Sequence, residues 1–515
     1  MKKNIIAFIL CLLILLSACG NPSAGHDNSP VPSYDPSGSE GCAAHADQDD
    51  DGLCDLCEVS VLVAVDLFGI NDLHGKLPDG NNHPGVDELT TYLKNARESN
   101  DHVVLLSVGD MWQGTSESNL TEGNMITEWM NEMDFVAMTL GNHEFDWGED
   151  PVRENAELAE FPFLAINIYE RKTNTQVPYC QSSLMVECGG VQIGVIGAIG
   201  DCYSSISSEQ TKNIYFKTGS ELTGLVKKES EMLREQGADF IVYMIHDGFG
   251  DSRSGTLSSS SLKSYYDTKL SEGYVDIVFE AHTHQRYVFT DPQGVYHIQG
   301  GGDNRGITHV EVQINSANGN HTVKTAEALA SGTYARLEGD ELVAQLMDKY
   351  ADVIAPATRV VGTNAQKRSG NEMRQLVADL YYKIGMERWG ADYNIALGGG
   401  FISVRDPGYL AAGEVTYGQL QGLFPFDNEL VLCSVSGRNL REKFFETDHY
   451  AYYICYGSYG SSIKNNIDPD GTYYVVVDSY TSTYAPNGLT EIERYDPDVY
   501  ARDLLAEYIE NGGLK

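Results

Sequence analysis

The chain has 515 residues, of which 42% are hydrophobic and 21% are charged, as is ordinary for a soluble globular protein. This length exceeds a single compact core, so two domains with small additions are expected. The formal net charge is −39, from 35 basic and 74 acidic residues. Because binding to a nucleic-acid backbone needs clustered Lys and Arg, this balance argues against a nucleic-acid polymer as the partner.

Residues 1–19 are typical of an export signal. Lys2 and Lys3 precede an apolar run from Ile5 to Leu16, which is too short to cross a bilayer as a mature helix. Leu16-Ser17-Ala18-Cys19 resembles the bacterial lipobox, whose cysteine is diacylated and becomes the mature N-terminus. The alternative is an ordinary signal peptide with a chance cysteine. Two acyl chains suffice for stable attachment, so we expect a lipid anchor at Cys19 on the extracellular face of the cell membrane.

Two short segments separate this signal from the body of the chain. Residues 20–41 are rich in Pro, Ser, Gly, Asn and Asp and are expected to form a disordered tether. Residues 42–58 form a small module with three open interpretations. Cys42-x-x-His45 and Cys54-x-x-Cys57 have the spacing of zinc ligands, whereas Asp47-x-Asp49-x-Asp51-Gly52 resembles the start of a calcium-binding loop. The third interpretation is an acidic, partly disulfide-bonded spacer.

From Val61 onward, strand-like apolar runs alternate with helical stretches, which is the pattern of an α/β domain. This domain is expected to span 61–330. Residues 331–355 are expected to form a linker helix, and 356–515 a second domain. The expected strands of the first domain are 61–70, 103–108, 135–140, 163–168, 191–198, 240–245 and 277–280. The expected helices are 86–98 and 124–132 in the first domain and 371–388 and 498–511 in the second.

Polar residues stand at the ends of five of these predicted strands. In α/β enzymes the carboxyl ends of strands are where ligands bind. A single Asp or His there is usually a turn residue, but five such segments in order are hard to explain by turns. Carboxylates, imidazoles and an amide suit Zn²⁺, Mn²⁺ or Fe. The segments are Asn71-Asp72-Leu73-His74-Gly75, Gly109-Asp110, Gly141-Asn142-His143-Glu144-Phe145-Asp146, His246-Asp247-Gly248 and Ala281-His282-Thr283-His284.

This series is similar to the calcineurin-like metallophosphoesterases. Its first segment, its second segment extended to Gly-Asp-x-x-Gln-Gly-Thr (Gly109–Thr115), and its third segment closely resemble the 5′-nucleotidase family. That family includes UDP-sugar hydrolases and 2′,3′-cyclic-nucleotide phosphodiesterase/3′-nucleotidases. The resemblance covers about residues 61–510, with Ala281 standing where the family usually has Gly. It implies an α/β fold in which a four-layer α/β-β-α metallophosphoesterase domain precedes an α+β C-terminal domain that binds the nucleoside.

The resemblance also implies two metal sites and a catalytic dyad. Two close metals can bind phosphate oxygens and lower the pKa of a bound water. Asp146 would hold the His143 imidazole as a cation, and His143 would stabilise charge on the phosphoryl group or assist the leaving oxygen. Asp110 would bridge the metals. The first metal would be bound by Asp72, His74, Asp110 and His284, and the second by Asp110, Asn142, His246 and His282.

Substrate recognition is where the chain departs from this family. Phe426, in Leu423-Phe424-Pro425-Phe426, matches the first of two aromatic rings that sandwich the base, and Tyr484 is a candidate for the second. Leu397-Gly398-Gly399-Gly400-Phe401-Ile402 stands where the family has Asn-Gly-Gly-Gly-Ile-Arg. Arg405 and Arg374 are the candidates to supply the missing charge.

The expected function is therefore hydrolysis of phosphate from small nucleotides outside the cell. One alternative is a 2′,3′-cyclic-nucleotide phosphodiesterase/3′-nucleotidase or another hydrolase of organic phosphate esters. An alternative of a different class is a surface binding protein that keeps the fold without catalysis.

Overall fold

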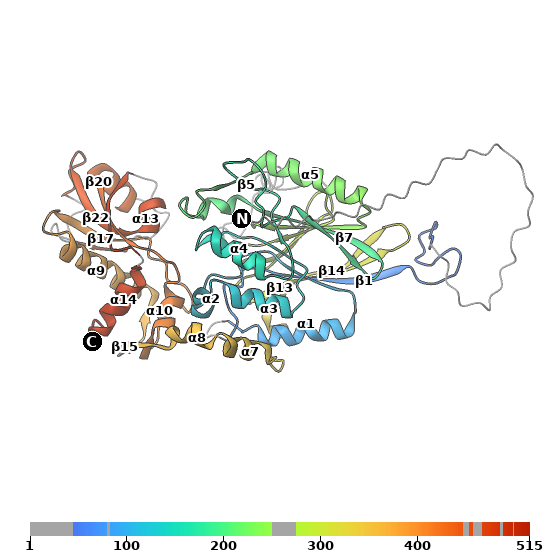
Figure 1. Cartoon of the computed structure of the whole chain (residues 1–515), viewed down its shortest axis with the longest axis horizontal. Coiled ribbons are helices and arrows are strands. Elements are labelled where there is room, and N and C mark those ends of the chain that lie inside the picture. Colours follow the sequence, from blue (N-terminus) through green and yellow to red (C-terminus); the bar gives the residue numbers. More distant parts are fainter. Residues whose placement is uncertain are drawn as a thin grey trace, which may run out of the picture. The chain divides into compact units, whose positions relative to one another are not determined.

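The computed structural model describes residues 45–79, 83–249, 274–445, 453–456, 466–484, 488–497 and 499–514 (Figure 1). The expected signal peptide with Cys19, the tether, and residues 42–44 of the small module with Cys42 lie outside these residues. Within the described ranges, no helix is both long enough and apolar enough to cross a membrane.

The N-terminal domain is built on two six-stranded sheets. In the first sheet β1, β2, β3 and β4 run parallel, while β13 pairs antiparallel with β1. Its order is β14 (His321–Ala330), β13 (Gly306–Asn315), β1 (Leu62–Ile70), β2 (Val103–Ser107), β3 (Ala137–Thr139) and β4 (Phe163–Leu164). The order of the second sheet is β11 (Arg286–Thr290), β12 (Tyr296–Gly300), β10 (Ile277–Glu280), β9 (Phe240–His246), β7 (Val191–Ile199) and β6 (Ser183–Cys188).

The two sheets pack face to face between two layers of helices, and the side chains that alternate along each strand contact both layers. On β1, Val65 and Leu67 pack in the cluster that joins the two sheets, whereas Phe68 packs with α1 (Asp87–Ser99) and α3 (Asn124–Glu132). Side chains of successive strand residues point to opposite faces, so one strand serves both layers. The outer face of the second sheet is covered by α5 (Gly219–Glu235). The predicted four-layer arrangement is confirmed.

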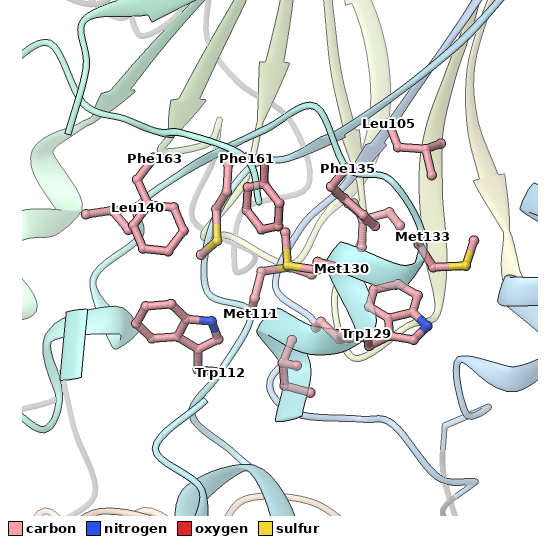
Figure 2. Packing of buried hydrophobic residues seen from close by; sticks show 14 of the residues in the cluster. Leu105, Met111, Trp112, Trp129, Met130, Met133, Phe135, Leu140, Phe161 and Phe163 are labelled. Carbon is pink, nitrogen blue, oxygen red and sulfur yellow. The ribbon is translucent and has the colours of Figure 1, made fainter. Parts of the chain in front are cut away.

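A cluster of aromatic and methionine side chains packs between the first sheet and α3, and Figure 2 shows it from close by. Trp112 is fully buried there, and its ring centroid lies 5.8 Å from that of Phe163. Burying one such large apolar side chain contributes roughly 2–3 kcal/mol. Because Met111 and Trp112 directly follow Asp110, this packing fixes the loop that carries the predicted bridging carboxylate.

The C-terminal domain surrounds a five-stranded sheet, and with this the predicted two-domain fold is confirmed. The long helix α9 (Gly370–Arg388) begins at a capping box made by Ser369 and Glu372 and packs against β17. A Cβ atom at Gly398 would lie 2.3 Å from the backbone nitrogen of Tyr382 in α9, so the glycine permits this helix contact. The sheet order is β21 (Tyr453–Tyr456), β17 (Ile395–Gly400), β22 (Thr472–Asp478), β20 (Leu430–Ser436) and β23 (Leu489–Arg494).

The linker differs from the single helix expected over 331–355. It consists of short pieces because the chain before Leu342 is held to the first domain by Tyr334, which is fully buried and donates its hydroxyl to the Asn304 carbonyl at 3.1 Å. The Asp340 carboxylate then accepts the Leu342 N–H at 3.0 Å, where the first helix begins. The pieces are η3 (Ser331–Thr333), α7 (Leu342–Lys349), α8 (Ala351–Ile354) and η4 (Ala355–Thr358).

Candidate active site

Strand ends from both sheets bring the predicted metal ligands to one place. Nε2 of His284 lies 3.4 Å from an Asp72 carboxylate oxygen, and Nε2 of His246 lies 3.1 Å from one of Asp110. Asp72, His74 and His284 form one group whose ligand atoms lie within 4.8 Å of one another, and Asp72, Asp110 and His246 form a second. His282 joins His246 in a further such group. The two groups share Asp72 and are therefore adjacent.

Hydrogen bonds at Nδ1 fix the orientation and the tautomer of the His74 and His246 rings. Nδ1 of His74 lies 2.8 Å from the carbonyl oxygen of Gln113, and Nδ1 of His246 lies 2.6 Å from that of Val108. A carbonyl oxygen only accepts hydrogen bonds, so each Nδ1 carries the proton and donates it. In the neutral form of each ring, Nε2 then directs its lone pair into the cluster, as a histidine bound to a metal does.

The charge and burial of the cluster fit a cation at its centre. Burial, together with nearby His284, lowers the pKa of His74 to about 3, so this imidazole is neutral. Burial alone would lower the pKa of His246, but the Asp110 carboxylate raises it to about 10. The buried Oδ1 atom of Asn142 has no hydrogen-bond partner among the described residues. An unpaired buried acceptor is costly, and a bound cation would remove that cost.

Backbone conformation adds a feature that the sequence did not reveal. Asp72, His74 and Asp110 have φ angles of 49°, 51° and 54°, and His282 and His284 have 69° and 53°. Left-handed φ values are uncommon outside glycine and cost of order 1–3 kcal/mol each where the surroundings enforce them. The chain therefore turns at each ligand, which lets both members of the Asp72/His74 and His282/His284 pairs face the same cluster.

The predicted dyad is also assembled beside the ligands. Nδ1 of His143 lies 2.7 Å from Oδ2 of Asp146, in the turn of η1 (His143–Phe145). Burial would lower the pKa of His143, but Asp146 and Asp110 raise it above the usual value, which favours the imidazolium. The ring centroid of His143 lies 5.2 Å from that of His74. A donor imidazole thus stands next to the predicted metal ligands.

Glu144, between the two dyad residues, positions the loops that carry the ligands. It is fully buried, and its two carboxylate oxygens accept the backbone N–H groups of Asp110, Met111 and Gly141 at 2.9, 2.8 and 2.7 Å. These contacts make it a brace between the loops after β2 and β3.

A cavity of about 320 Å³ opens beside His74 and His284. Arg405 lines it, and the guanidinium of Arg405 lies 5.2 Å from the Phe426 ring centroid. The Phe426 ring is half-buried and lies 5.8 Å from that of His143, centroid to centroid. Arg405 and Phe426 are therefore brought to the predicted metals and dyad.

The other two substrate-binding candidates are placed differently. Nε of Arg374 donates to the Ile402 carbonyl oxygen at 3.0 Å and Nη1 to the Asn371 side chain at 2.9 Å, and Arg374 does not line the cavity. Tyr484 ends α13 (Ser479–Tyr484), and its side chain lies outside the described part of the chain. Leu397 and Ile402, the apolar substitutes for the family's polar pair, are buried in hydrophobic clusters.

Three groups near the site do not belong to any of the predicted site motifs. Lys76 and Arg305 line the cavity with Arg405, and Lys76 is only 6% exposed. The Cys202 sulfur lies within 4.8 Å of the ligand atoms of His246 and His282. Only Lys76 carried a usable signal, because it directly follows the Asn71–Gly75 segment.

Comparisons with known proteins agree with this geometry. Residues 67–286 match the calcineurin-like phosphoesterase family, and residues 351–454 match the 5′-nucleotidase C-terminal domain. The endonuclease YhcR of Bacillus subtilis is 26% identical over 83% of this chain, which spans 38% of that protein's length. The protein UshA of Yersinia enterocolitica is 25% identical over 73% of this chain and 75% of its own. A putative 5′-nucleotidase structure from Staphylococcus aureus shares the fold, with a TM-score of 0.68, 19% identity, and 88% and 98% of the two chains covered.

The fold and the site define a metallophosphoesterase, a hydrolase that acts on phosphate ester bonds. With its second domain, the chain belongs to the 5′-nucleotidase family of calcineurin-like phosphoesterases. The alternative of a binding protein without catalysis is set aside, because the relatives are hydrolases.

Proposed function

We propose that this protein removes phosphate from small nucleotides with the help of two divalent metal ions. The observation that carries the proposal is the convergence of buried carboxylates, lone-pair imidazole nitrogens and an unpaired amide oxygen beside the His143–Asp146 pair. Asp72, His74, Asp110 and His284 would hold one ion, and Asp110, Asn142, His246 and His282 the other. Zn²⁺, Mn²⁺ and Fe suit this mixture of donors.

Two such ions, when bound, would hold phosphate oxygens and supply an activated water. The chain's own groups supply the remaining steps. His143 would hold a proton on its ring through the contact between Nδ1 and Asp146, and its Nε2 would donate to a phosphoryl oxygen or to the leaving oxygen. Such a group contributes about 10²–10⁴-fold to the rate.

The cavity supports a negatively charged, aromatic substrate. Arg405 would orient the phosphate group. Lys76 and Arg305 also line the cavity, but Asp303 and Asp406 line it as well and lie 3.7–3.9 Å from them, so these carboxylates offset their charge. Phe426, beside His143, offers the flat apolar face on which a base can stack. These groups support a nucleotide better than a simple phosphate ester.

The chain lacks the two polar substrate contacts of the family's Asn and Arg, because the buried Leu397 and Ile402 stand in their places. A 2′,3′-cyclic nucleotide or a 3′-nucleotide is the second candidate, since the cavity offers charge without a recognisable reader of the 5′ position. A nucleic-acid polymer is a weaker candidate despite the name of the Bacillus relative, because the chain carries a net charge of −39.

Phosphate release from a substrate panel tests this proposal. The panel contains 5′-, 3′- and 2′,3′-cyclic nucleotides, a UDP-sugar, a small aliphatic phosphate ester and single-stranded DNA. We expect release from nucleotides that stops with a chelator and returns with Zn²⁺, Mn²⁺ or Fe²⁺. Undiminished release in the chelator would contradict the metal requirement, and cleavage of DNA in preference to nucleotides would contradict the substrate class.

For the location we propose a lipid anchor through Cys19 on the outer face of the membrane. Support comes from the basic, apolar and lipobox-like residues 2–19, which lie outside the described part of the chain. When a detergent extract of cells is separated into two phases, the protein should enter the detergent phase, and the Cys19→Ser variant should enter the aqueous phase. Equal partitioning of both forms would remove the anchor from the proposal.

A further inference from the structure

A second group of metal-ligating side chains lies in the module that precedes β1. His45, Cys54 and Cys57 bring their ligand atoms within 4.8 Å of one another, and Nδ1 of His45 lies 3.6 Å from the Cys57 sulfur. The predicted active site lies beyond the other end of β1, a strand of 9 residues. At about 3.3 Å per residue, β1 alone separates the two groups by about 30 Å, so they are independent.

The distances suit one tetrahedral zinc ion. Zinc–sulfur and zinc–nitrogen bonds of about 2.3 and 2.0 Å place neighbouring ligand atoms about 3.5 Å apart. The distance of 3.6 Å between His45 and Cys57 agrees with this edge. Thiolate and imidazole ligands select zinc over calcium, which takes oxygen ligands.

Backbone geometry holds these ligands in place. The Asp55 N–H donates to the Ala46 carbonyl oxygen at 2.8 Å, and the Cys54 N–H donates to that of Val59 at 2.9 Å. The Cys54 side chain is buried, and backbone N–H groups of Ala46 and Leu56 point at its sulfur. Donors directed at the sulfur are typical of a thiolate that binds a metal.

The module is in turn fastened to the catalytic domain at the turn between β13 and β14. Asn315 donates through Nδ2 to the Asp47 carboxylate at 2.7 Å, and Asn318 donates to the Asp47 carbonyl oxygen at 3.2 Å. The Ser316 N–H donates to the Val61 carbonyl oxygen at 2.8 Å. A metal that closes the module therefore also fixes the point at which the N-terminal segment joins the enzyme.

We propose that His45, Cys54 and Cys57 bind a structural zinc ion that is separate from the catalytic metals. The ion clamps the module onto the start of β1.

The acidic residues of the module are a separate group. Asp47, Asp49 and Asp55 also bring oxygens within 4.8 Å of one another, and Glu58 stands twelfth from Asp47, as in a calcium loop. Both carboxylate oxygens of Asp47 already accept backbone N–H groups, from Asp51 and Gly52. This acidic group carries no proposal, but calcium is included in the metal analysis below.

The test compares the purified full chain with a Cys54→Ser/Cys57→Ser double variant. Metal content is measured by mass spectrometry, and Co²⁺ loaded into chelator-stripped protein reports thiolate ligation through its sulfur-to-metal charge-transfer band. We expect the double variant to lose one zinc equivalent and this band, and phosphate release to stay within about twofold because of the distance. Cys188→Ser, which removes a half-buried thiol on β6, is the matched control and should keep both signals.

A second variant separates this site from the catalytic one. Asp110→Asn should lose activity and catalytic metal but keep the thiolate band, whether or not the proposed nucleotide activity is correct. Equal zinc content in the double variant and the parent would overturn the proposal. So would loss of calcium in place of zinc, or a Cys54–Cys57 disulfide found in the protein alkylated without reduction.

Discussion

Oε2 of Glu144 accepts the backbone N–H of Asp110 at 2.9 Å, so a buried carboxylate outside the predicted ligand set holds the residue at the centre of that set. The same carboxylate accepts the N–H groups of Met111 and Gly141. Three backbone donors thus depend on one side chain. This arrangement lets the Asp110 loop keep its left-handed φ of 54°.

Replacing Glu144 should therefore loosen the site without removing a predicted ligand. Glu144→Ala leaves three buried N–H groups unpaired, each at a cost of about 1–3 kcal/mol, and should lower both the thermal midpoint and the metal content. Glu144→Gln keeps one acceptor oxygen, so its thermal midpoint and metal content should lie between those of the parent and those of Glu144→Ala. Calorimetry and metal analysis of both variants test this role. A Glu144→Ala protein with the parent's midpoint and metal content would show that Glu144 is a turn residue only.

Asp110→Asn should remove the predicted bridge between the two metals. Oδ2 of Asp110 lies 3.1 Å from Nε2 of His246. An asparagine at this position has one neutral oxygen in place of two that share a negative charge. We expect the loss of at least one of about two metal ions and of nearly all phosphate release. Asp66→Asn, on the same sheet but bound to His309, is the control for loss of a carboxylate. Full turnover by Asp110→Asn would refute the assignment.

His143→Ala should separate catalysis from metal binding. The ring is paired with Asp146 rather than directed at the carboxylates, so metal content should stay at the parent's level. Turnover should fall by about 10²–10⁴-fold. Asp146→Asn should cause a smaller loss, because the imidazole stays but its cation is less stabilised. If metal leaves together with activity, His143 is a ligand and the division of roles is wrong.

Phe426→Ala tests whether the aromatic ring reads the base. The loss of stacking should cost about 1–3 kcal/mol and raise KM for a nucleotide roughly 5- to 100-fold, while KM for an aliphatic phosphate ester barely changes. Phe426→Trp keeps a flat aromatic face and should restore the nucleotide KM. Because the ring also packs beside His143 and Arg405, kcat for the ester reports any disturbance of the dyad. Equal KM changes for both substrates would make Phe426 a packing residue.

The buried Asp478 should make the C-terminal domain less stable as pH rises. Burial raises the pKa of Asp478 from 3.8 to about 6, so the folded state favours the protonated carboxyl. The stability it contributes is full below about pH 4 and is lost as pH rises through about 6, a change of roughly 3 kcal/mol. Asp478→Asn should thus gain stability over the parent between these pH values, seen in unfolding midpoints. Asp470→Asn changes an exposed carboxylate, so its unfolding midpoint should follow the same pH dependence as that of the parent.

The sequence determined the family-level features of this protein because they are encoded in local patterns. The alternation of strands and helices gave the two-domain α/β fold, and most predicted strands agree with the structure within a few residues. The segments around Asp72, Asp110 and His143 identified the class of chemistry. Expectations that depended on local helix periodicity were less secure, as the segmented linker between Ser331 and Thr358 shows.

Only the tertiary structure decided how these residues act together, because that depends on contacts between distant segments. Strand ends more than 200 residues apart bring Asp72 beside His284, and the loop brace by Glu144 and the tautomers of His74 and His246 follow from backbone partners elsewhere in the chain. Arg405 and Arg374 looked equivalent in sequence, yet one lines the cavity and the other is bonded to the Ile402 carbonyl. A local pattern specifies which groups are available, whereas packing of the whole fold sets their distances, burial and charge.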